Sequence, residues 1–155
     1  MGNNNGYCQD SELSWVHWEN LPASAEELRE FSTRLIKLRR ENPIFRRDNW
    51  RDGMDVTWFN PVGGVQTEEH WSDPGSTTIG LRLSQSDYSD EGWNDVLLLF
   101  NPHDGDVDFK LPADKDDWTT VLTTADPDAS EETIDADEYR LSPRSLVVLR
   151  SGTPA

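Results

Sequence analysis

Short apolar runs separated by turn residues fill the chain from residue 55 onward, and they constrain its fold most strongly. Within these runs the apolar residues recur with a period of about two, which is typical of half-buried strands. No helical pattern lies between them, so the chain is predicted to be mainly β and to form an antiparallel β-sandwich. The expected strands cover residues 56–59, 79–83, 95–101, 107–111, 119–124, 133–134, 139–141 and 145–150. Residues 96–100 are apolar on both faces, which indicates a central strand.

The sequence before residue 51 has a different pattern. Residues 1–23 show no period and are expected to form a loop. A long helix is predicted over residues 24–42, because Ser24 and Glu27 have the spacing of a capping box and Pro43 ends the pattern. The helix carries an apolar stripe, made of residues three or four apart. The stripe consists of Leu28, Phe31, Leu35 and Leu38.

The chain is strongly acidic, with 30 Asp and Glu against 14 Lys and Arg and a formal net charge of -16. Such a surface repels the phosphates of nucleic acids and of anionic membranes, so neither is expected as a partner. Neutral sugars remain compatible with it, since they bind through stacking and hydrogen bonds. Cys8 is the only cysteine, and no apolar run is long enough to span a bilayer. We therefore expect a cytoplasmic protein without disulfides.

Clustered carboxylates are the first candidates for acid catalysis, in which one carboxyl of a pair needs a raised pKa. The clusters at residues 87–91, 114–117 and 126–128 lie in polar loops, without the apolar surroundings that raise a carboxyl pKa. The three histidines lie in different segments and match no metal-binding spacing. The prediction is that this chain holds no catalytic residue, no metal site and no cofactor.

The tryptophans are expected to serve packing more than binding. Trp58, Trp93 and Trp118 stand beside predicted strands, where aromatic side chains usually fill a core or cover an edge. Trp15 and Trp18 are expected to pack against the predicted helix. The alternative, in which these rings stack on a sugar, stays open.

Residues 2–10, GNNNGYCQD, and residues 13–18, LSWVHW, resemble the GNNNAYCQDN and LTWLDW segments of bacterial glycogen debranching enzymes. These enzymes are isoamylase-like members of glycoside hydrolase family 13, in the α-amylase superfamily. The resemblance continues through the helix end LIKLRR, the stretches DVTWFNP and HWSDP, and the strands LLLFN and SLVVL. It covers nearly the whole chain. Gly6, Ser11 and His17 depart from the pattern, where the family has Ala, Asn and Asp.

The resemblance implies a (β/α)8 barrel followed by a C-terminal antiparallel β-domain. Residues 1–50 would be the tail of the catalytic barrel, made of a loop and the last barrel helix, and residues 51–155 would be the C-terminal β-sandwich. The catalytic acids of the family lie on barrel strands that precede residue 2, so the chain alone is expected to be inactive. The full-length enzyme that would contain this chain, called the parent below, would hydrolyse α-1,6-glucosidic branch linkages in glycogen and limit dextrin.

The same resemblance brings the Asn-rich loop to the substrate cleft of the parent. Its candidate glucan-binding residues are Asn3, Asn4, Asn5, Tyr7, Gln9 and Asp10. A turn that only supports its neighbours is the alternative for this loop. The apolar helix stripe would cover the parent's own catalytic barrel. Without that barrel, the stripe is expected to pack on the sandwich or to form a homodimer with a second copy.

Two other functions stay open at this point. One is a non-catalytic β-sandwich module that binds α-glucan through tryptophans, and the other is an interaction domain without a ligand. Residues 2–45 favour the debranching enzyme, because a free sugar-binding module has no use for the tail of a barrel. The sequence leaves open the preferred branch length and the oligomeric state.

Overall fold

The computed structural model describes residues 10–12, 14–15, 17–19, 21–46, 54–85, 92–115 and 117–151. The chain divides into two units, Met1–Lys37 and Leu38–Ala155, and each is described by itself. The helix α1 (Ala23–Glu41) contributes to both units. The short 3-10 helix η1 (Pro43–Phe45) follows it within the second unit.

Helix α1 confirms the predicted helix, with its ends shifted by one residue. It begins at Ala23, so Ser24 lies inside the first turn and the predicted capping box is wrong in that detail. Glu26 and Arg29 form an ion pair on its surface. None of its residues is buried, and the stripe residues Leu28 and Leu35 are exposed. The partner of this stripe stays a prediction.

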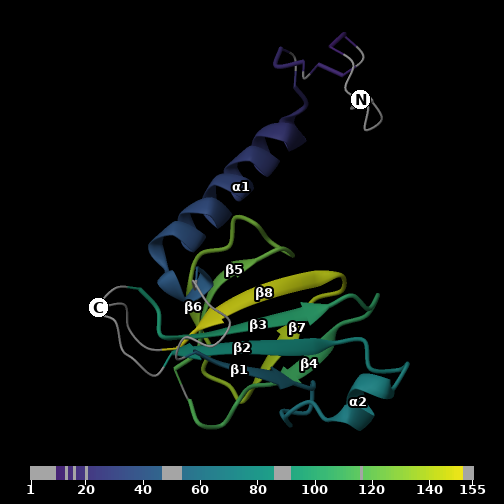
Figure 1. Ribbon diagram of the computed structural model, residues 1–155, viewed down its shortest axis with the longest axis vertical. Coiled ribbons are helices and arrows are strands. Elements are labelled where there is room, and N and C mark those ends of the chain that lie inside the picture. The colour runs from purple at the N-terminus through teal and green to yellow at the C-terminus, as the bar shows by residue number, and fades with distance from the viewer. Residues whose placement is uncertain are drawn as a thin grey trace. The chain divides into compact units, whose positions relative to one another are not determined.

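The second unit contains the eight predicted strands, arranged as two antiparallel sheets (Figure 1). The larger sheet has the strand order β1-β2-β3-β8-β5-β6, and the smaller one pairs β4 with β7. The strands are β1 (Met54–Phe59), β2 (Ile79–Gln85), β3 (Asp95–Asn101), β4 (Val107–Lys110), β5 (Thr119–Thr123), β6 (Glu132–Thr133), β7 (Glu138–Leu141) and β8 (Ser145–Arg150). The mainly β sandwich is therefore confirmed. Strand β3 pairs with β2 and β8, so its predicted central position is also confirmed.

One helix interrupts the strands, against the prediction that none would. Helix α2 (Glu68–Ser72) lies in the connection between β1 and β2. Its first turn is closed by a capping box in which the Thr67 backbone N–H donates to His70 Nδ1 at 3.1 Å. Five residues are too few to show a helical period, so the sequence pattern did not reveal α2.

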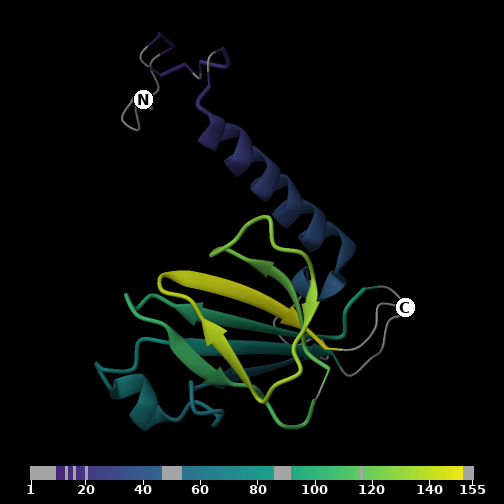
Figure 2. The same cartoon turned by 180° about the vertical axis from the view of Figure 1, so that it is seen from behind.

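The core lies between the two sheets, where the inner faces of β3 and β8 meet those of β4 and β7 (Figure 2). Phe109 and Trp118 are its largest fully buried side chains. The core cluster consists of the buried residues Phe59, Leu97, Leu99, Phe109, Leu111, Trp118, Leu141, Val147 and Leu149. Its members on β3 and on β8 are spaced two residues apart, as expected for the side chains on one face of a strand.

Gly80 in β2 leaves room for the Phe109 ring. A Cβ at this position would stand 2.8 Å from Phe109 Cζ and 3.1 Å from Leu99 Cδ2. We expect Gly80→Ala to destabilise the chain by about 1–3 kcal/mol, because the packed core cannot admit another methyl group without shifting. Urea unfolding measures the change. Gly75→Ala in an exposed turn is the control, and an equal loss in both variants would contradict the expectation.

No helix among the described residues is long and apolar enough to cross a membrane.

Candidate functional site

Strand β2 of the large sheet turns Gly80 and Arg82 toward the core and its apolar residues away from it. Gly80 of β2 lies against Phe109, and the Arg82 guanidinium lies 5.7 Å from the centre of the Trp118 ring, so both residues face the core. Side chains alternate along a strand, and Ile79, Leu81 and Leu83 therefore point to the opposite side. The apolar positions of β2 thus turn away from the core between the sheets.

Neighbouring strands extend this second apolar surface across the sheet. The register pairs Trp58 with Leu81, Leu81 with Leu98, and Leu98 with Val148. Parallel rows run beside it, because Val56 pairs with Leu83 and Ile79 with Phe100, which pairs with Leu146. We call this surface the outer face. It consists of Val56, Trp58, Ile79, Leu81, Leu83, Leu98, Phe100, Leu146 and Val148.

Much of the outer face is accessible to solvent. Val56 and Trp58 on the edge strand β1 are 39% and 36% exposed, and Leu81, Leu98 and Phe100 are partly exposed. Helix η1 lies against β2, and its Ile44 is buried. An apolar surface that solvent partly reaches is a candidate for an interaction site.

A shallow hollow of about 620 Å³ opens on the outer face. The surface that it exposes is almost entirely apolar, although Thr77, Asn101, Thr124, Arg144 and Ser145 also line it, and it is formed by strand ends and the residues next to them. Its apolar lining residues include Trp58, Ile79, Phe100, Pro102 and Leu146. Such a lining suits apolar side chains of a protein partner better than sugar hydroxyls, which need hydrogen-bonding groups.

Helix α2 carries the apolar surface beyond the edge strand. Trp71 of α2 meets Trp58 edge to face, with ring centroids 5.6 Å apart and an interplanar angle of 76°. Trp71 remains 56% exposed. The capping box of α2 and the turn in which Gly75 N–H donates to Asp73 Oδ1 at 2.8 Å hold this helix in place. Trp58 and Trp71 therefore extend the apolar surface at one border of the outer face, and solvent reaches both rings.

The glucan-binding residues predicted from the resemblance lie mostly outside the described part of the chain. This holds for Asn3, Asn4, Asn5, Tyr7 and Gln9. Asp10 is described, and its Oδ1 accepts a hydrogen bond of 2.6 Å from Trp15 Nε1. The role predicted for this loop therefore stays a prediction.

The carboxylate clusters differ in what the structure places around them. Residues 87–91 and Asp116 lie outside the described residues. Asp114 is exposed and receives a 2.8 Å hydrogen bond from Arg82, and Asp126 Oδ1 accepts from the Asp128 backbone at 3.2 Å. Within the described ranges, no group of three or more His, Cys, Asp or Glu side chains is placed to hold a metal ion.

The tryptophans divide between core and surface. Trp118 is 1% exposed and confirms the packing predicted for it. Trp93 is partly buried and meets Phe45 edge to face at 6.3 Å, as expected for edge packing. Trp58 lies on the edge strand β1 and packs against Trp71, which agrees with edge packing, and it also belongs to the outer face. Trp15 and Trp18 are 54% and 78% exposed, and the packing predicted for their rings stays a prediction.

The strand at residues 79–83 shows in the sequence that β2 has one apolar side, but the sequence does not tell which way that side points. Its apolar residues occupy odd positions only, and Gly80 and Arg82 occupy the even ones. A strand with one apolar side normally turns that side to the core. Here Arg82 enters the core side through its ion pair with Asp95, which joins residues 13 positions apart and has no local pattern.

Comparison with known proteins gives a family and several longer relatives. Residues 55–150 match the protein family described as isoamylase, C-terminal. The glycogen operon protein GlgX homolog of Mycobacterium tuberculosis (strain ATCC 25618 / H37Rv) is 35% identical over 169 residues, covering 96% of this chain and 23% of the relative. The glycogen debranching enzyme of Dickeya chrysanthemi is 34% identical over 152 residues, covering 96% and 20%. The chain thus spans about a fifth of the length of these curated relatives.

Solved structures share the fold at low sequence identity. Pullulanase type I from Bacillus subtilis str. 168, complexed with maltose, matches 84% of this chain and 16% of its own, with a TM-score of 0.62 and 16% identity. The pullulanase from Bacillus acidopullulyticus gives a TM-score of 0.56 at 17% identity, covering 83% of this chain and 14% of its own. At this identity the likeness concerns the fold alone, and it agrees with the β-sandwich.

Proposed function

Because this chain belongs to the isoamylase C-terminal family, we propose that it is the C-terminal part of a glycogen debranching enzyme. The parent would hydrolyse α-1,6-glucosidic branch linkages in glycogen and limit dextrin. Residues 1–50 would form the tail of its catalytic barrel, and residues 51–155 its C-terminal β-sandwich. The names of the two relatives above and the coverage of 96% of this chain support the proposal.

The observation that carries the proposed role of the sandwich is the outer face. A sheet that turns Trp58, Leu81 and Phe100 away from its own core leaves apolar area in water, at about 25 cal/mol per Å². The parent's own barrel would cover this face and gain that free energy. The domain would then stabilise the enzyme without contributing catalytic acids. The Asn-rich loop, including Asn3, Tyr7 and Asp10, would reach the glucan from the barrel side.

A chimera tests this function directly. The C-terminal part of the M. tuberculosis GlgX homolog that matches this chain is exchanged for the chain, and release of linear chains from glycogen and limit dextrin is measured. We expect the chimera to cleave branch linkages and the chain alone to be inactive, because the catalytic acids belong to the preceding barrel. Turnover by the isolated chain, or a folded chimera that cleaves no branch linkage, would contradict the proposal.

A matched pair of variants tests docking through the outer face. Val56 lies on that face, whereas Val62 lies in the connection between β1 and β2 and is exposed. In the chimera, Val56→Glu is expected to lower the melting temperature and the activity, because docking would bury the new carboxylate. Val62→Glu is expected to change neither. In the isolated chain both variants should melt within a few degrees of the unsubstituted chain, since both valines are exposed there.

A further inference from the structure

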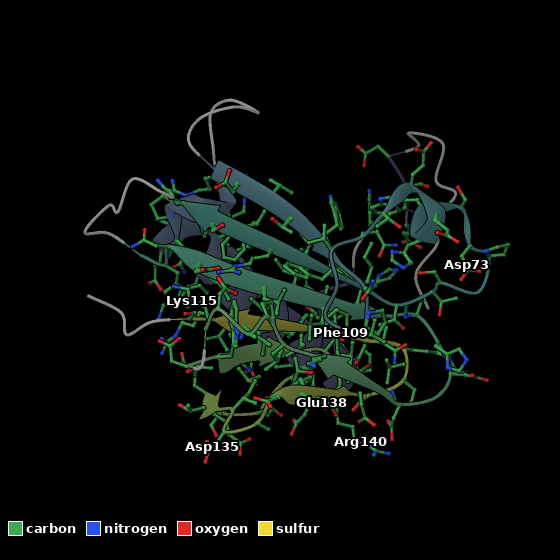
Figure 3. The ribbon with its side chains drawn as sticks, turned by 90° about the horizontal axis from the view of Figure 1, so that it is seen from below. Asp73, Phe109, Lys115, Asp135, Glu138 and Arg140 are labelled. Atoms are coloured by element: carbon green, nitrogen blue, oxygen red, sulfur yellow. The ribbon has the colours of Figure 1, made fainter. Side chains whose placement is uncertain are left out.

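A second recess lies at one end of the sandwich and does not involve the outer face. It consists of two hollows of about 380 and 410 Å³ that share Lys115 as a wall, and we call them together the end cleft. Each hollow is within the range of about 300–1,000 Å³ that is typical of ligand sites. Figure 3 shows Lys115 at one end of the sandwich and Asp73, which follows α2, at the other. The end cleft is therefore separate from the Trp58–Trp71 pair.

Hydrogen bonds hold several charged side chains of the end cleft, whereas Lys115 makes a longer ion pair with Asp95. Arg82 donates two hydrogen bonds to the Asp95 carboxylate, of 2.8 and 2.6 Å, and a third of 2.8 Å to Asp114. Ser151 Oγ donates to Asp117 Oδ1 at 2.7 Å. Lys115 Nζ stands 3.8 Å from Asp95 Oδ2, which is beyond hydrogen-bond length, and its side chain is 36% exposed. Its ammonium group can therefore donate to a ligand without losing a hydrogen bond to Asp95.

Aromatic and amide side chains complete the walls. Trp93 lines the larger hollow beside Gln85 and Asn94, and its ring is fixed by Phe45 on one edge and by the Arg150 guanidinium at 6.0 Å. Trp118 borders the smaller hollow but is only 1% exposed, and its buried Nε1 has no hydrogen-bond partner among the described residues. A rigid indole next to amides, carboxylates and an ammonium group offers stacking and hydrogen bonds within one recess.

The balance of charge in the cleft limits the class of ligand. Its walls carry the cations Arg82, Lys110 and Lys115 and the anions Asp95, Asp117, Asp135 and Asp137. An anionic ligand would be repelled by the carboxylates of the cleft, and the Arg82 guanidinium is already paired with Asp95 and Asp114. The net charge of -16 on the whole chain adds to this repulsion. An apolar ligand would cover the polar groups of the walls without offering them hydrogen bonds, which costs free energy. A neutral ligand with many hydroxyl groups fits both constraints.

We propose that the end cleft binds a short segment of neutral α-glucan as a site separate from the catalytic barrel. The two hollows on either side of Lys115 would hold neighbouring glucose units, with the Lys115 ammonium donating to their hydroxyl groups. The α linkage rests on the proposed function, whereas the saccharide class rests on the walls of the cleft. Such a site would keep a branched polymer attached to the enzyme while individual chains enter and leave the barrel.

Isothermal titration of the full chain with maltoheptaose tests the proposal, with cellohexaose and inorganic phosphate as comparison ligands. We expect saturable binding of maltoheptaose that is at least tenfold weaker in Lys115→Ala, the loss typical of one charged hydrogen bond. Lys37→Ala is the matched control, because Lys37 belongs to α1 and lines neither hollow. Two-dimensional NMR adds a second readout, in which the Trp93 indole signal should shift with the ligand.

Each alternative outcome overturns the assignment. Absence of maltoheptaose binding, tighter binding of phosphate or cellohexaose, or equal affinity in Lys115→Ala and the parent sequence would each show that the end cleft is no α-glucan site. Equal affinity would move the sugar to another surface, such as the Asn-rich loop. The proposed function is judged separately, by branch cleavage in the chimera, and it survives a failure of the end cleft.

Discussion

Asp95→Ala is expected to destabilise the isolated chain by about 3 kcal/mol, because the substitution leaves a buried guanidinium without its main partner. The side chains of Arg82 and Asp95 are only 12% and 10% exposed. The hydrogen bonds to Asp95 are the largest cause that raises the pKa of Arg82 above its usual value, and burial opposes them. The expected loss stays at the lower end of the 3–5 kcal/mol known for broken buried pairs, since Asp114 still accepts from Arg82.

Two further variants separate this pair from an ordinary surface contact. Asp106→Ala breaks the ion pair between Arg140 and Asp106, whose side chains are far more exposed, and should cost less than about 1 kcal/mol. The double variant Arg82→Met with Asp95→Leu should be more stable than Asp95→Ala alone, because no unpaired charge remains buried. Urea unfolding compares all three. Equal losses for Asp95→Ala and Asp106→Ala would show that the Arg82 pair contributes no more than a surface pair.

Strand positions followed from local pattern because each run carried its own signal. The run at residues 95–101 is apolar at successive positions, and β3 is paired on both sides as such a strand requires. The helix α1 had a stripe with the right spacing and a proline beyond its end. Bounds agreed to within two residues for strands and one for the helix, which is the range over which such ends are defined.

Contacts between distant residues could not be predicted from local pattern. Asn101 ends an apolar strand, yet it is buried and its Nδ2 donates to the carbonyl oxygens of Gly105 and Ser142, both at 2.9 Å. Its Oδ1 accepts from the His103 backbone at 3.0 Å. This amide ties together two loops at one end of the sandwich. The sequence around residue 101 contains no pattern that predicts a hydrogen bond to a residue 41 positions away.

The candidate sites show the same limit more sharply. The loop predicted to touch glucan came from the resemblance, and of its residues only Asp10 is described. The outer face required the strand register, because a period of two says that a strand has an apolar side and does not say where that side points. The end cleft required the packed fold, since Trp93 comes from the connection between β2 and β3, whereas Lys115 and Trp118 come from the connection between β4 and β5.

Comparing Phe109→Ala with Phe100→Ala tests whether the outer face of the isolated chain is accessible to solvent. Both phenylalanines lie on strands of the sandwich, but Phe109 is fully buried between the sheets and Phe100 is partly exposed on the outer face. Phe109→Ala is expected to cost about 3–5 kcal/mol, because it removes the ring that packs on Gly80 and leaves a cavity. Phe100→Ala is expected to cost less than Phe109→Ala in the isolated chain, since the Phe100 side chain is only partly buried.

The comparison becomes decisive when it is repeated in the chimera. If the barrel covers the outer face, Phe100→Ala should cost several times more in the chimera than in the isolated chain, whereas the cost of Phe109→Ala should stay the same. Urea unfolding of the chain and thermal inactivation of the chimera measure the two costs. A loss for Phe100→Ala in the isolated chain as large as that for Phe109→Ala would mean that something already buries the face. Sedimentation would then show whether a second copy does so, and docking on the barrel would lose its physical basis.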